Sequence, residues 1–426
     1  MAEPSWLPAP SNYPGSFYED LYKSLHANPN LSTQESFAAE TVCQHLESLN
    51  TRNPGQYAIH SRIGGYGVAA VLRNGPGKTV LLRADMDALP VEETTGLAYA
   101  STKREVDLAD QLEKPVMHAC GHDVHVTCLL AAADALAADT KAWSGTLVLV
   151  FQPNEERGKG AQAMVEGGLY DKVPVPDMVL GQHVYPFRSG QVKVRTGPFF
   201  SAADSFRITL FGRGAHGSMP SRSIDPVVLA ANVVLRLQGI VSRETDPAEF
   251  AVLTVGSVQA GQTENIISDK AVLGLDFRTF STVTRGRILA ALHRIVKAEC
   301  QASGCTREPL IEETRRFPML VNDGEVTAEV GKSFARDFRG DFDPDWAHVP
   351  ASEDVSVLAE SVGKPCCYWT FGGTEAETWD RAEKEGKIME DIPVNHSGYF
   401  APVIQPTLKT GTRALYAAAL TFLKKE

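Results

Sequence analysis

The sequence predicts two domains: an α/β domain with a central mixed sheet, and an α+β domain inserted into it. Three observations lead to this prediction. At 426 residues the chain exceeds an ordinary single domain. Short apolar strands alternate with helices near both ends of the chain, and the middle changes to open in-and-out alternation. We therefore place the split α/β domain at residues 1–199 and 315–426, and the inserted domain at residues 200–314.

The first α/β segment begins with helical spacing over residues 16–49. Strands are expected at residues 57–72 and 79–83, and helices follow at 124–138 and 161–167. The run TLVLVF after Gly145 lacks alternation, which indicates a strand buried on both faces. A further short strand is expected at 177–181. Ligand sites in such sheets gather beyond the carboxyl ends of the strands, where we expect Glu155, Glu156 and His183.

The inserted segment shows a β-α-β-β-α order, which predicts a small antiparallel sheet covered by two helices on one face. Its strands are expected at residues 205–211, 251–258 and 271–277, and its helices at 225–240 and 285–300. The α/β pattern then resumes, with helices near 325–338 and 406–424 and an apolar segment at 365–371.

The composition limits the class of protein. A hydrophobic content of 43% is ample for large cores, and a net charge of −11 disfavours nucleic acid and anionic membranes as partners. The proline-rich first fifteen residues are expected to form an extended arm. They carry no secretory signal, and no apolar run long enough for a membrane span is evident. Seven irregularly spaced cysteines fit a reducing, cytoplasmic setting.

The stretch 117–125, MHACGHDVH, concentrates the side chains that bind transition metals. A buried Cys or a single His usually reflects only packing, but five potential ligands within nine residues favour a metal site. They are His118, Cys120, His122, Asp123 and His125. We therefore predict a metal-dependent hydrolase.

Glu155 and Glu156 follow a buried strand, and adjacent side chains point in different directions. One carboxylate can bind a cation while the other takes a proton from water; the alternative is a solvated loop pair. His183 and His396 are weak candidates alone, but a dinuclear site needs more ligands than Cys120, His122 and Glu156 supply. Asp87 is expected to accept a hydrogen bond that orients a ligating His, with a strand-end turn as the alternative.

Nine segments then occur in one order: RADMDALP, MHACGHDVH, FQPNEE, GQHV, GRGAHGSMP, ENIISD, DFRTF, SED and NHSGYF. Over about residues 16–425 the chain resembles the dinuclear-metal aminoacylase and carboxypeptidase family. The nearest branch holds hippurate hydrolases and auxin–amino acid conjugate hydrolases. This resemblance implies a phosphorylase/hydrolase-like α/β domain. It also implies an inserted lid and dimerisation domain with a ferredoxin-like four-stranded antiparallel sheet and two helices.

The resemblance also implies roles for individual residues. Cys120 is the expected bridging ligand, Glu155 the general base, and His216 a lid histidine that stabilises the oxyanion and is contributed across a dimer. Asn265 and Arg278 match substrate-contacting positions, and Arg suits a free carboxylate. For the last three residues the alternatives are helix-start packing, a turn and a surface ion pair. The implied metal ligands are Cys120, His122, Glu156, His183 and His396.

Two positions depart from the family pattern. Asp85 stands where other branches carry a metal-binding His, and Ser268 stands where many relatives have Pro. Neither removes an expected ligand. The expected activity is hydrolysis of the amide bond of N-acyl amino acids by two divalent ions, zinc or manganese first and cobalt or nickel as alternatives. A dipeptidase or carboxypeptidase on the same centre, and a non-catalytic metal-binding relative, remain alternatives.

Overall fold

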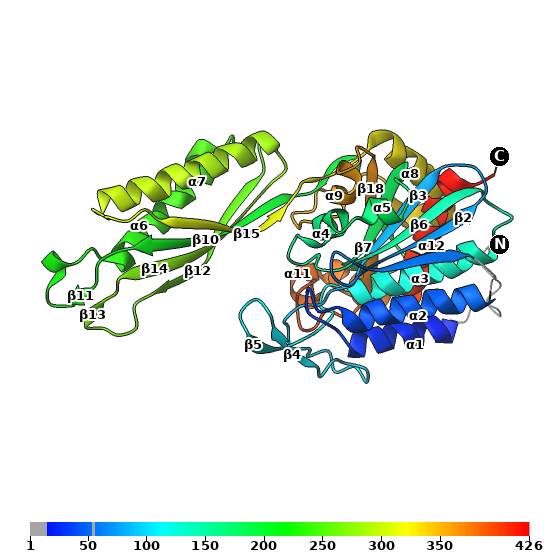
Figure 1. The fold of residues 1–426 in the computed structure, drawn as a ribbon, viewed down its shortest axis with the longest axis horizontal. Helices are drawn as coiled ribbons and strands as arrows, with labels where there is room; N and C mark the ends of the chain where they lie inside the picture. Colours follow the sequence, from blue (N-terminus) through cyan, green and yellow to red (C-terminus); the bar gives the residue numbers. More distant parts are fainter. Residues whose placement is uncertain (1–14, 53–55, 426) are drawn as a thin grey trace. The chain divides into compact units, whose positions relative to one another are not determined.

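The computed structural model describes residues 15–52 and 56–425, so the predicted N-terminal arm lies outside the described residues. The chain forms two compact units (Figure 1). We call Met1–Gly197, Val321–Ala347 and Asp354–Glu426 the α/β unit, and Pro198–Leu320 with His348–Glu353 the α+β unit. The sequence analysis placed the limits of the inserted domain at 200 and 314.

The α/β unit is built on an eight-stranded mixed sheet, as predicted. β3 pairs in parallel with β6 and β7, and β7 pairs in parallel with β18. β2 is antiparallel to both β1 and β6. In sheet order the strands are β1 (Tyr57–Ile63), β2 (Gly67–Asn74), β6 (Gly145–Gln152), β3 (Thr79–Asp85), β7 (Met178–Arg188), β18 (Cys366–Thr374), β8 (Val192–Val194) and β17 (Phe342–Asp343).

Helices cover both faces of this sheet, which explains why β6 is buried along its whole length. α3 (His122–Ala138), α8 (Gly324–Phe338) and α12 (Ile404–Leu423) pack on one face, and α4 (Gly160–Glu166) and α9 (Ser356–Glu360) on the other. Small residues let α3 and α12 approach each other closely, and Gly411 of α12 faces Cys128 of α3. The remaining elements are α1 (Gly15–Ala27), α2 (Ser36–Arg52), β4 (Arg104–Asp107), β5 (Leu112–Pro115), α5 (Leu169–Lys172), α10 (Ala376–Glu385) and α11 (Ile388–Asp391), with β9 (Gly197–Phe200) and β16 (Leu320–Asn322) near the limits of the units.

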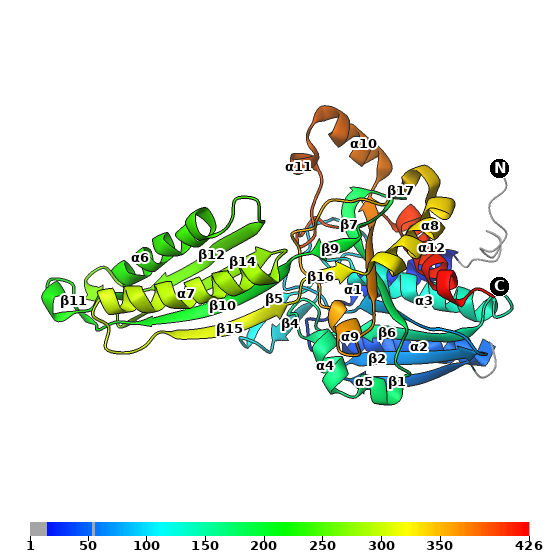
Figure 2. The ribbon, with the colours of Figure 1, turned by 90° about the horizontal axis from the view of Figure 1, so that it is seen from above.

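The α+β unit has a four-stranded antiparallel sheet with two helices on one face (Figure 2). The sheet order is β12 (Ala251–Ala260), β14 (Lys270–Thr279), β10 (Ala202–Phe211) and β15 (Leu310–Phe317). α6 (Pro226–Gly239) begins at Asp225, whose side chain accepts from the first-turn amides, and α7 (Thr282–Ala302) begins at Ser281 in the same way. A short ladder of β11 (Ala215–His216) and β13 (Ile266–Ile267) extends beyond one end of the sheet.

One described segment, Pro226–Glu244, is long and apolar enough to cross a membrane by length and composition alone. It is not a continuous apolar run, because Asn232, Arg236 and Gln238 interrupt it. In the structure, Leu229, Val233 and Leu237 of this segment are fully buried in the core of the α+β unit. The pattern belongs to an amphipathic helix that packs on a sheet.

Three expectations need correction. The helical spacing over residues 16–49 forms two helices, because Pro29 interrupts the pattern and a turn separates α1 from α2. β7 continues to Arg188, so His183 lies within the strand, paired with Thr370, and not beyond its end. The pattern gave only three strands for the inserted segment and missed the fourth, β15, which has no apolar run because its charged side chains are exposed at the sheet edge.

Candidate metal centre

Four segments of the α/β unit bring the five expected metal ligands together. Cys120 and His122 stand at the start of α3, Glu156 follows β6, His183 lies in β7, and His396 lies in a turn before α12. Their donor atoms form two groups, each with all atoms within 4.8 Å of one another. One group is Cys120, His122 and His183; the other is Cys120, Glu156 and His396. Cys120 belongs to both, so the geometry suits two adjacent cations that share its sulfur.

Individual distances describe the same arrangement. The Cys120 Sγ lies 3.2 Å from His396 Nε2 and 3.5 Å from His183 Nε2. The Glu156 carboxylate lies 3.5 Å from His396 Nε2 and 3.8 Å from His122 Nε2. Among the described residues, His122 Nε2 and Glu156 Oε1 are buried without any hydrogen-bond partner. Buried polar atoms are normally satisfied, so these converging lone pairs fit a bound metal ion.

Neighbouring groups fix the direction of the histidine rings. His183 Nδ1 donates to the Val184 carbonyl at 2.7 Å, which turns Nε2 toward Cys120. His122 Nδ1 lies 3.4 Å from Asp87 Oδ1, which turns its Nε2 toward Glu156. Asp87 therefore lies where it can orient a ligating histidine, the role expected for it. The His396 side chain is 55% exposed, so the centre is open on that side.

Electrostatics give a second sign that the centre suits cations. Burial raises the pKa of the Cys120 thiol, and the charges of Glu156 and Glu155 raise it further. Burial lowers the pKa of His122, but the Asp85 charge and the Asp87 hydrogen bond outweigh it and raise the pKa to about 10. Acidic groups thus gather in a buried space where positive charge is favoured. Divalent ions would supply that charge and displace protons from the ligands.

His125, one of the five potential ligands of the 117–125 stretch, is not a ligand in this arrangement. Its Nδ1 is 2.5 Å from Asp85, and its Nε2 accepts from the Val184 amide at 2.8 Å. Both ring nitrogens are therefore used. Asp85 is also paired with the buried guanidinium of Arg83 at 2.6 Å. Asp85 and His125 thus form a support beneath the ligands, which the spacing of donors in the sequence could not distinguish from the ligands themselves.

His118 and Asp123 complete the 117–125 stretch, and among the described residues neither belongs to a group of converging donor atoms. Burial lowers the pKa of His118 to about 4. Asp123 Oδ2 lies 2.7 Å from Nδ1 of His26, and Nε2 of His26 lies 3.0 Å from Glu93. Helix α1 is therefore tied by a buried ion triad to the helix that carries the first ligands. No local sequence pattern predicts this triad, because its members are 30 to 97 positions apart.

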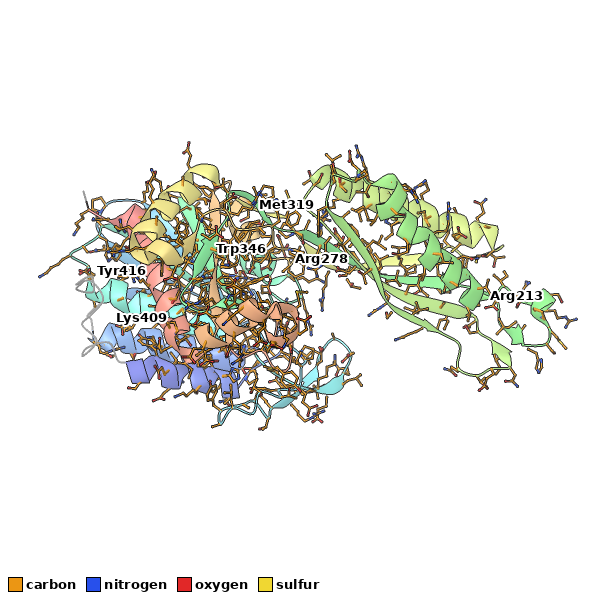
Figure 3. All side chains as sticks on the ribbon, turned by 180° about the vertical axis from the view of Figure 1, so that it is seen from behind. Arg213, Arg278, Met319, Trp346, Lys409 and Tyr416 are labelled. Atoms are coloured by element: carbon orange, nitrogen blue, oxygen red, sulfur yellow. The ribbon has the colours of Figure 1, made fainter. Side chains whose placement is uncertain are left out.

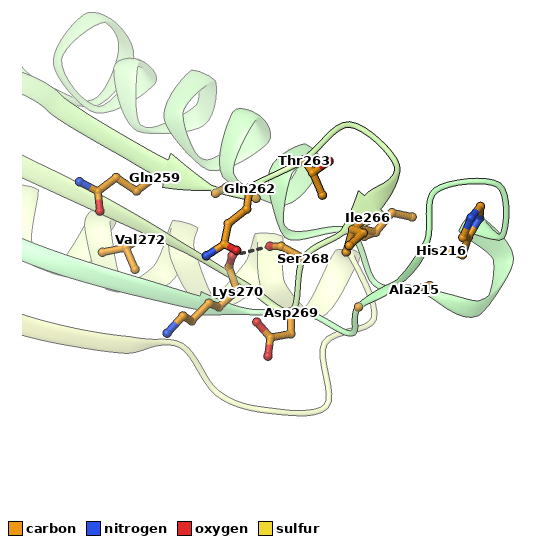
Figure 4. Close-up of a pocket in the computed structure, with 14 residues that line it drawn as sticks. Ala215, His216, Gln259, Gln262, Thr263, Ile266, Ser268, Asp269, Lys270 and Val272 are labelled. Atoms are coloured by element: carbon orange, nitrogen blue, oxygen red, sulfur yellow. Dashed lines mark hydrogen bonds between the residues drawn. The ribbon is translucent and has the colours of Figure 1, made fainter.

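In the α+β unit, His216 and Asn265 lie close together. The two-residue ladder pairs His216 with Ile266, and the Asn265 carbonyl accepts from the Gly217 amide at 2.7 Å. His216 is exposed; its Nδ1 contacts Ser218 Oγ at 2.7 Å and accepts from the Ser218 amide, which leaves Nε2 for another partner. His216 borders an open cavity of about 950 Å³, lined also by Ile266, Ser268 and Lys270 (Figure 4).

Arg278 lies in β14 of the four-stranded sheet, at the end away from Lys270. It is eight residues along β14 from Lys270, which is about 26 Å at roughly 3.3 Å per residue. Figure 3 shows this separation, with Arg213, which precedes the ladder, at one end of the unit and Arg278 at the other. Arg278 lies 3.1 Å from Asp276 and donates to the Pro350 carbonyl at 2.9 Å. Within one chain, Arg278 is therefore not brought together with His216 and Asn265.

Comparisons with known proteins agree with this geometry. The model of peptidase family M20/M25/M40 matches residues 81–392. The chain is 36% identical to a hippurate hydrolase from Campylobacter jejuni, over 82% of this chain and 86% of the relative. It is 34% identical to thermostable carboxypeptidase 2 from Saccharolobus solfataricus, over 95% of both. A solved structure described as an aminohydrolase, from methicillin-resistant Staphylococcus aureus, superposes with a TM-score of 0.78 at 29% identity, over 96% of this chain and 97% of that one.

Proposed function

The chain belongs to peptidase family M20/M25/M40, and we propose that it is a metal-dependent amidohydrolase that splits N-acyl amino acids into a carboxylic acid and a free amino acid. The observation that carries this proposal is the pair of donor groups that share Cys120, with Glu155 beside them. A pure binding site has no need for an extra buried carboxylate next to the ligands. The donor set of imidazole, thiolate and carboxylate suits zinc or manganese, with cobalt or nickel as alternatives.

Five residues would hold two divalent ions: Cys120, which belongs to both donor groups, with His122, Glu156, His183 and His396. When bound, such ions polarise an amide carbonyl and make water more acidic. Glu155 is buried and lies within the same cluster as His122 and Glu156. It takes the proton from the attacking water and then delivers it to the leaving amine. Glu155 is adjacent to Glu156 in sequence, and the two carboxylates thereby divide proton transfer and metal binding between them.

Substrate binding falls to the α+β unit. The planar guanidinium of Arg278 suits the free carboxylate of an amino acid through two parallel hydrogen bonds. His216 Nε2 can donate to the oxyanion that forms during attack, and Asn265 beside it can bind the substrate. An N-acyl amino acid is far shorter than the 26 Å or so that separates Arg278 from the start of β14. We therefore propose a homodimer, in which His216 and Asn265 of one copy join Arg278 of the other.

A second candidate function is a carboxypeptidase or dipeptidase on the same centre. The 34% identity to thermostable carboxypeptidase 2 favours it, and a peptide also presents an amide bond and a free carboxylate. A non-catalytic metal-binding role is opposed by the buried position of Glu155. The three functions differ in which amide is cleaved and whether any is.

The test is release of amino acid from a panel of N-acyl amino acids, including hippurate, and of dipeptides. The protein is stripped of metal and reloaded separately with zinc, manganese, cobalt or nickel. We expect release that requires a divalent ion and is faster with N-acyl amino acids than with dipeptides. Faster cleavage of dipeptides would select the peptidase function. Metal binding without release from any substrate would select the non-catalytic one.

The variant Glu155→Gln tests the assignment of the base. It keeps the shape of the side chain but cannot accept the proton, so turnover should fall about 10²- to 10⁴-fold while metal content stays unchanged. Metal content is measured by mass spectrometry of the dialysed protein. Retained turnover would remove Glu155 from its role as base.

A further inference from the structure

We propose that Glu35 is a positioning residue that, together with Asp87, holds the loop carrying Glu155 and Glu156. This inference rests on the proposed function, because it concerns the loop that supplies the base and one metal ligand. Glu35 lies between α1 and α2, more than a hundred positions from that loop in sequence.

Two buried carboxylates bind three consecutive peptide N–H groups of the loop. The Asn154 amide donates to Glu35 Oε1 at 2.9 Å. The Glu155 and Glu156 amides donate to Asp87, one to each carboxylate oxygen, at 3.1 and 3.0 Å. Glu35 and Asp87 are fully buried, so these hydrogen bonds are shielded from water. The backbone of the loop is thereby fixed at the residues that carry the chemistry.

The Glu35 side chain is itself held in place. Its Oε1 also accepts from the Thr33 amide at 2.6 Å, which curls the chain back on itself. The Glu35 carbonyl accepts from the Ala39 amide at 3.0 Å, so Glu35 directly precedes α2 as its N-cap residue. The residue is fully buried, and among the described residues its Oε2 has no hydrogen-bond partner.

Backbone strain marks both sides of this contact. Thr33 has φ +72° and Asn154 has φ +56°, in the left-handed region. For a β-branched residue such as Thr this conformation is a genuine outlier, and it persists only where the surroundings enforce it. Glu35 Oε1 binds the amides of both strained residues. The same turn supports the other carboxylate, because Ser32 Oγ donates to Asp87 at 2.7 Å. Hydrogen bonds from Glu35 and Ser32 thus connect the turn before α2 to the loop that carries Glu155 and Glu156.

Three variants of Glu35 separate its possible contributions. Glu35→Leu removes the acceptor and leaves the Asn154 amide buried and unpaired, so the loop should shift. Glu35→Asp keeps the charge but is one methylene too short to reach both amides. Glu35→Gln keeps an acceptor of the same length without charge. Burial, and then the charge of Asp87, raises the pKa of Glu35 to about 8, so Gln resembles the neutral carboxyl favoured near pH 7.

The measurements are kcat and KM with the best substrate, and metal affinity by competition with a chromogenic chelator. For Glu35→Leu we expect kcat and metal affinity each to fall about 10- to 100-fold with KM little changed, as for other residues that orient a metal site. Glu35→Asp should fall between Leu and wild type. Glu35→Gln should stay within about threefold of wild type. If Glu35→Leu does not fold, Glu35→Asp decides by the same two measurements.

The matched control is Asp323→Leu, which removes another carboxylate of the α/β unit that accepts backbone amides, those of Glu325 and Val326 at the start of α8, away from the loop. It should lower thermal stability but leave metal affinity within about threefold of wild type. Wild-type metal affinity and kcat in Glu35→Asp and Glu35→Leu would overturn the proposal, as would a loss in Glu35→Gln equal to that in Glu35→Leu. Metal affinity remains informative if the wild-type protein hydrolyses no substrate, so failure of the two proposals can be told apart.

Discussion

The expected site residues of the two units are held in opposite ways. In the α/β unit the expected ligands Cys120, His122, Glu156 and His183 are buried, and a second group contacts each of the two buried histidine rings. In the α+β unit His216 is exposed, and Arg278 lies at the other end of its sheet. The expected ligands of the α/β unit already lie together without substrate. In the α+β unit, a single chain does not bring His216 and Arg278 together.

This difference shows where each kind of chemistry can be placed. Metal ligands lose affinity quickly when they are misplaced, so they belong in a packed core where supports can hold them. Substrate contacts must admit and release a molecule, and exposed positions allow this. The comparison predicts that substitutions in the α/β unit act on metal binding, whereas those in the α+β unit act on catalysis alone and can be rescued by another copy.

Cys120→Ala should give the largest effect. Cys120 is the only member that the two donor groups share, so its loss should weaken both cation positions at once. We expect metal content to fall by at least about half and turnover to fall by orders of magnitude. Metal per chain after dialysis, measured by mass spectrometry, checks this.

Cys128→Ala is the matched control. Cys128 is also buried and lies eight positions further along, but its Sγ contacts the Leu408 carbonyl and no member of the metal centre. It should retain metal and lose only stability, by about 1 kcal/mol. Unchanged metal content in Cys120→Ala would remove Cys120 from the ligands, and with it the shared centre.

The second prediction concerns His216→Ala and Arg278→Ala, which should each keep full metal content. Each alone should lower kcat about 10²- to 10³-fold, because a donor to the transition state or a substrate anchor is lost. In a symmetric dimer with shared sites, an equal mixture of the two variants gives mixed dimers in half of the molecules. Each mixed dimer has one intact site of two, so activity should return to about a quarter of wild type.

The mixture must be unfolded and refolded together, or exchanged long enough for subunits to mix. The control mixes His216→Ala with Asn265→Ala, which lie beside each other and should not complement. Failure of the first mixture to recover activity, while size measurements show mixed dimers, would contradict the shared site.

Much of the architecture could be predicted because it depends on patterns that are local in sequence. Continuous apolar runs predicted the buried strands, as for β6, and an Ala/Leu-rich composition predicted α3. The expected ligands could be named because three of the five lie in two short motifs. The geometry that brings His183 and His396 to them depends on pairing of strands and turns far apart in the chain, and local spacing carries no information about it.

The supports of the centre were harder to predict for the same reason. The turn between α1 and α2 was assigned to one helical stretch, although Pro29 and Asn30 are signals that break a helix. That turn places Glu35 against the acidic loop. A buried carboxylate that binds distant backbone amides has no sequence pattern of its own, since its partners are peptide groups of any residue type.

The smallest predicted effect concerns stability and pH, and it again distinguishes the units. Burial lowers the pKa of His26, but its hydrogen bonds to Asp123 and Glu93 outweigh this and raise the pKa to about 10. The unfolded chain has a His pKa of about 6.5. The folded α/β unit therefore holds a proton that the unfolded chain releases above pH ~6.5, so its stabilisation is complete below that pH and is lost as pH rises through about 10.

Asp123 and Glu93 act in the opposite sense. Burial opposes their ionisation, but His118 and His26 lower the pKa of Asp123, and His26 and Thr95 lower that of Glu93. Their contribution is therefore present above pH ~4 and lost as pH falls. The unfolding temperature of the wild type should thus be highest near pH 5 to 6.5 and should fall toward pH 10. His26→Leu should lower the unfolding temperature and flatten the alkaline slope, whereas His60→Leu, at a half-buried position on β1, should leave the slope unchanged. An equal alkaline slope in wild type and His26→Leu would show that the triad does not carry this pH dependence, and that the α/β unit is not held together by the buried charges that distinguish it here.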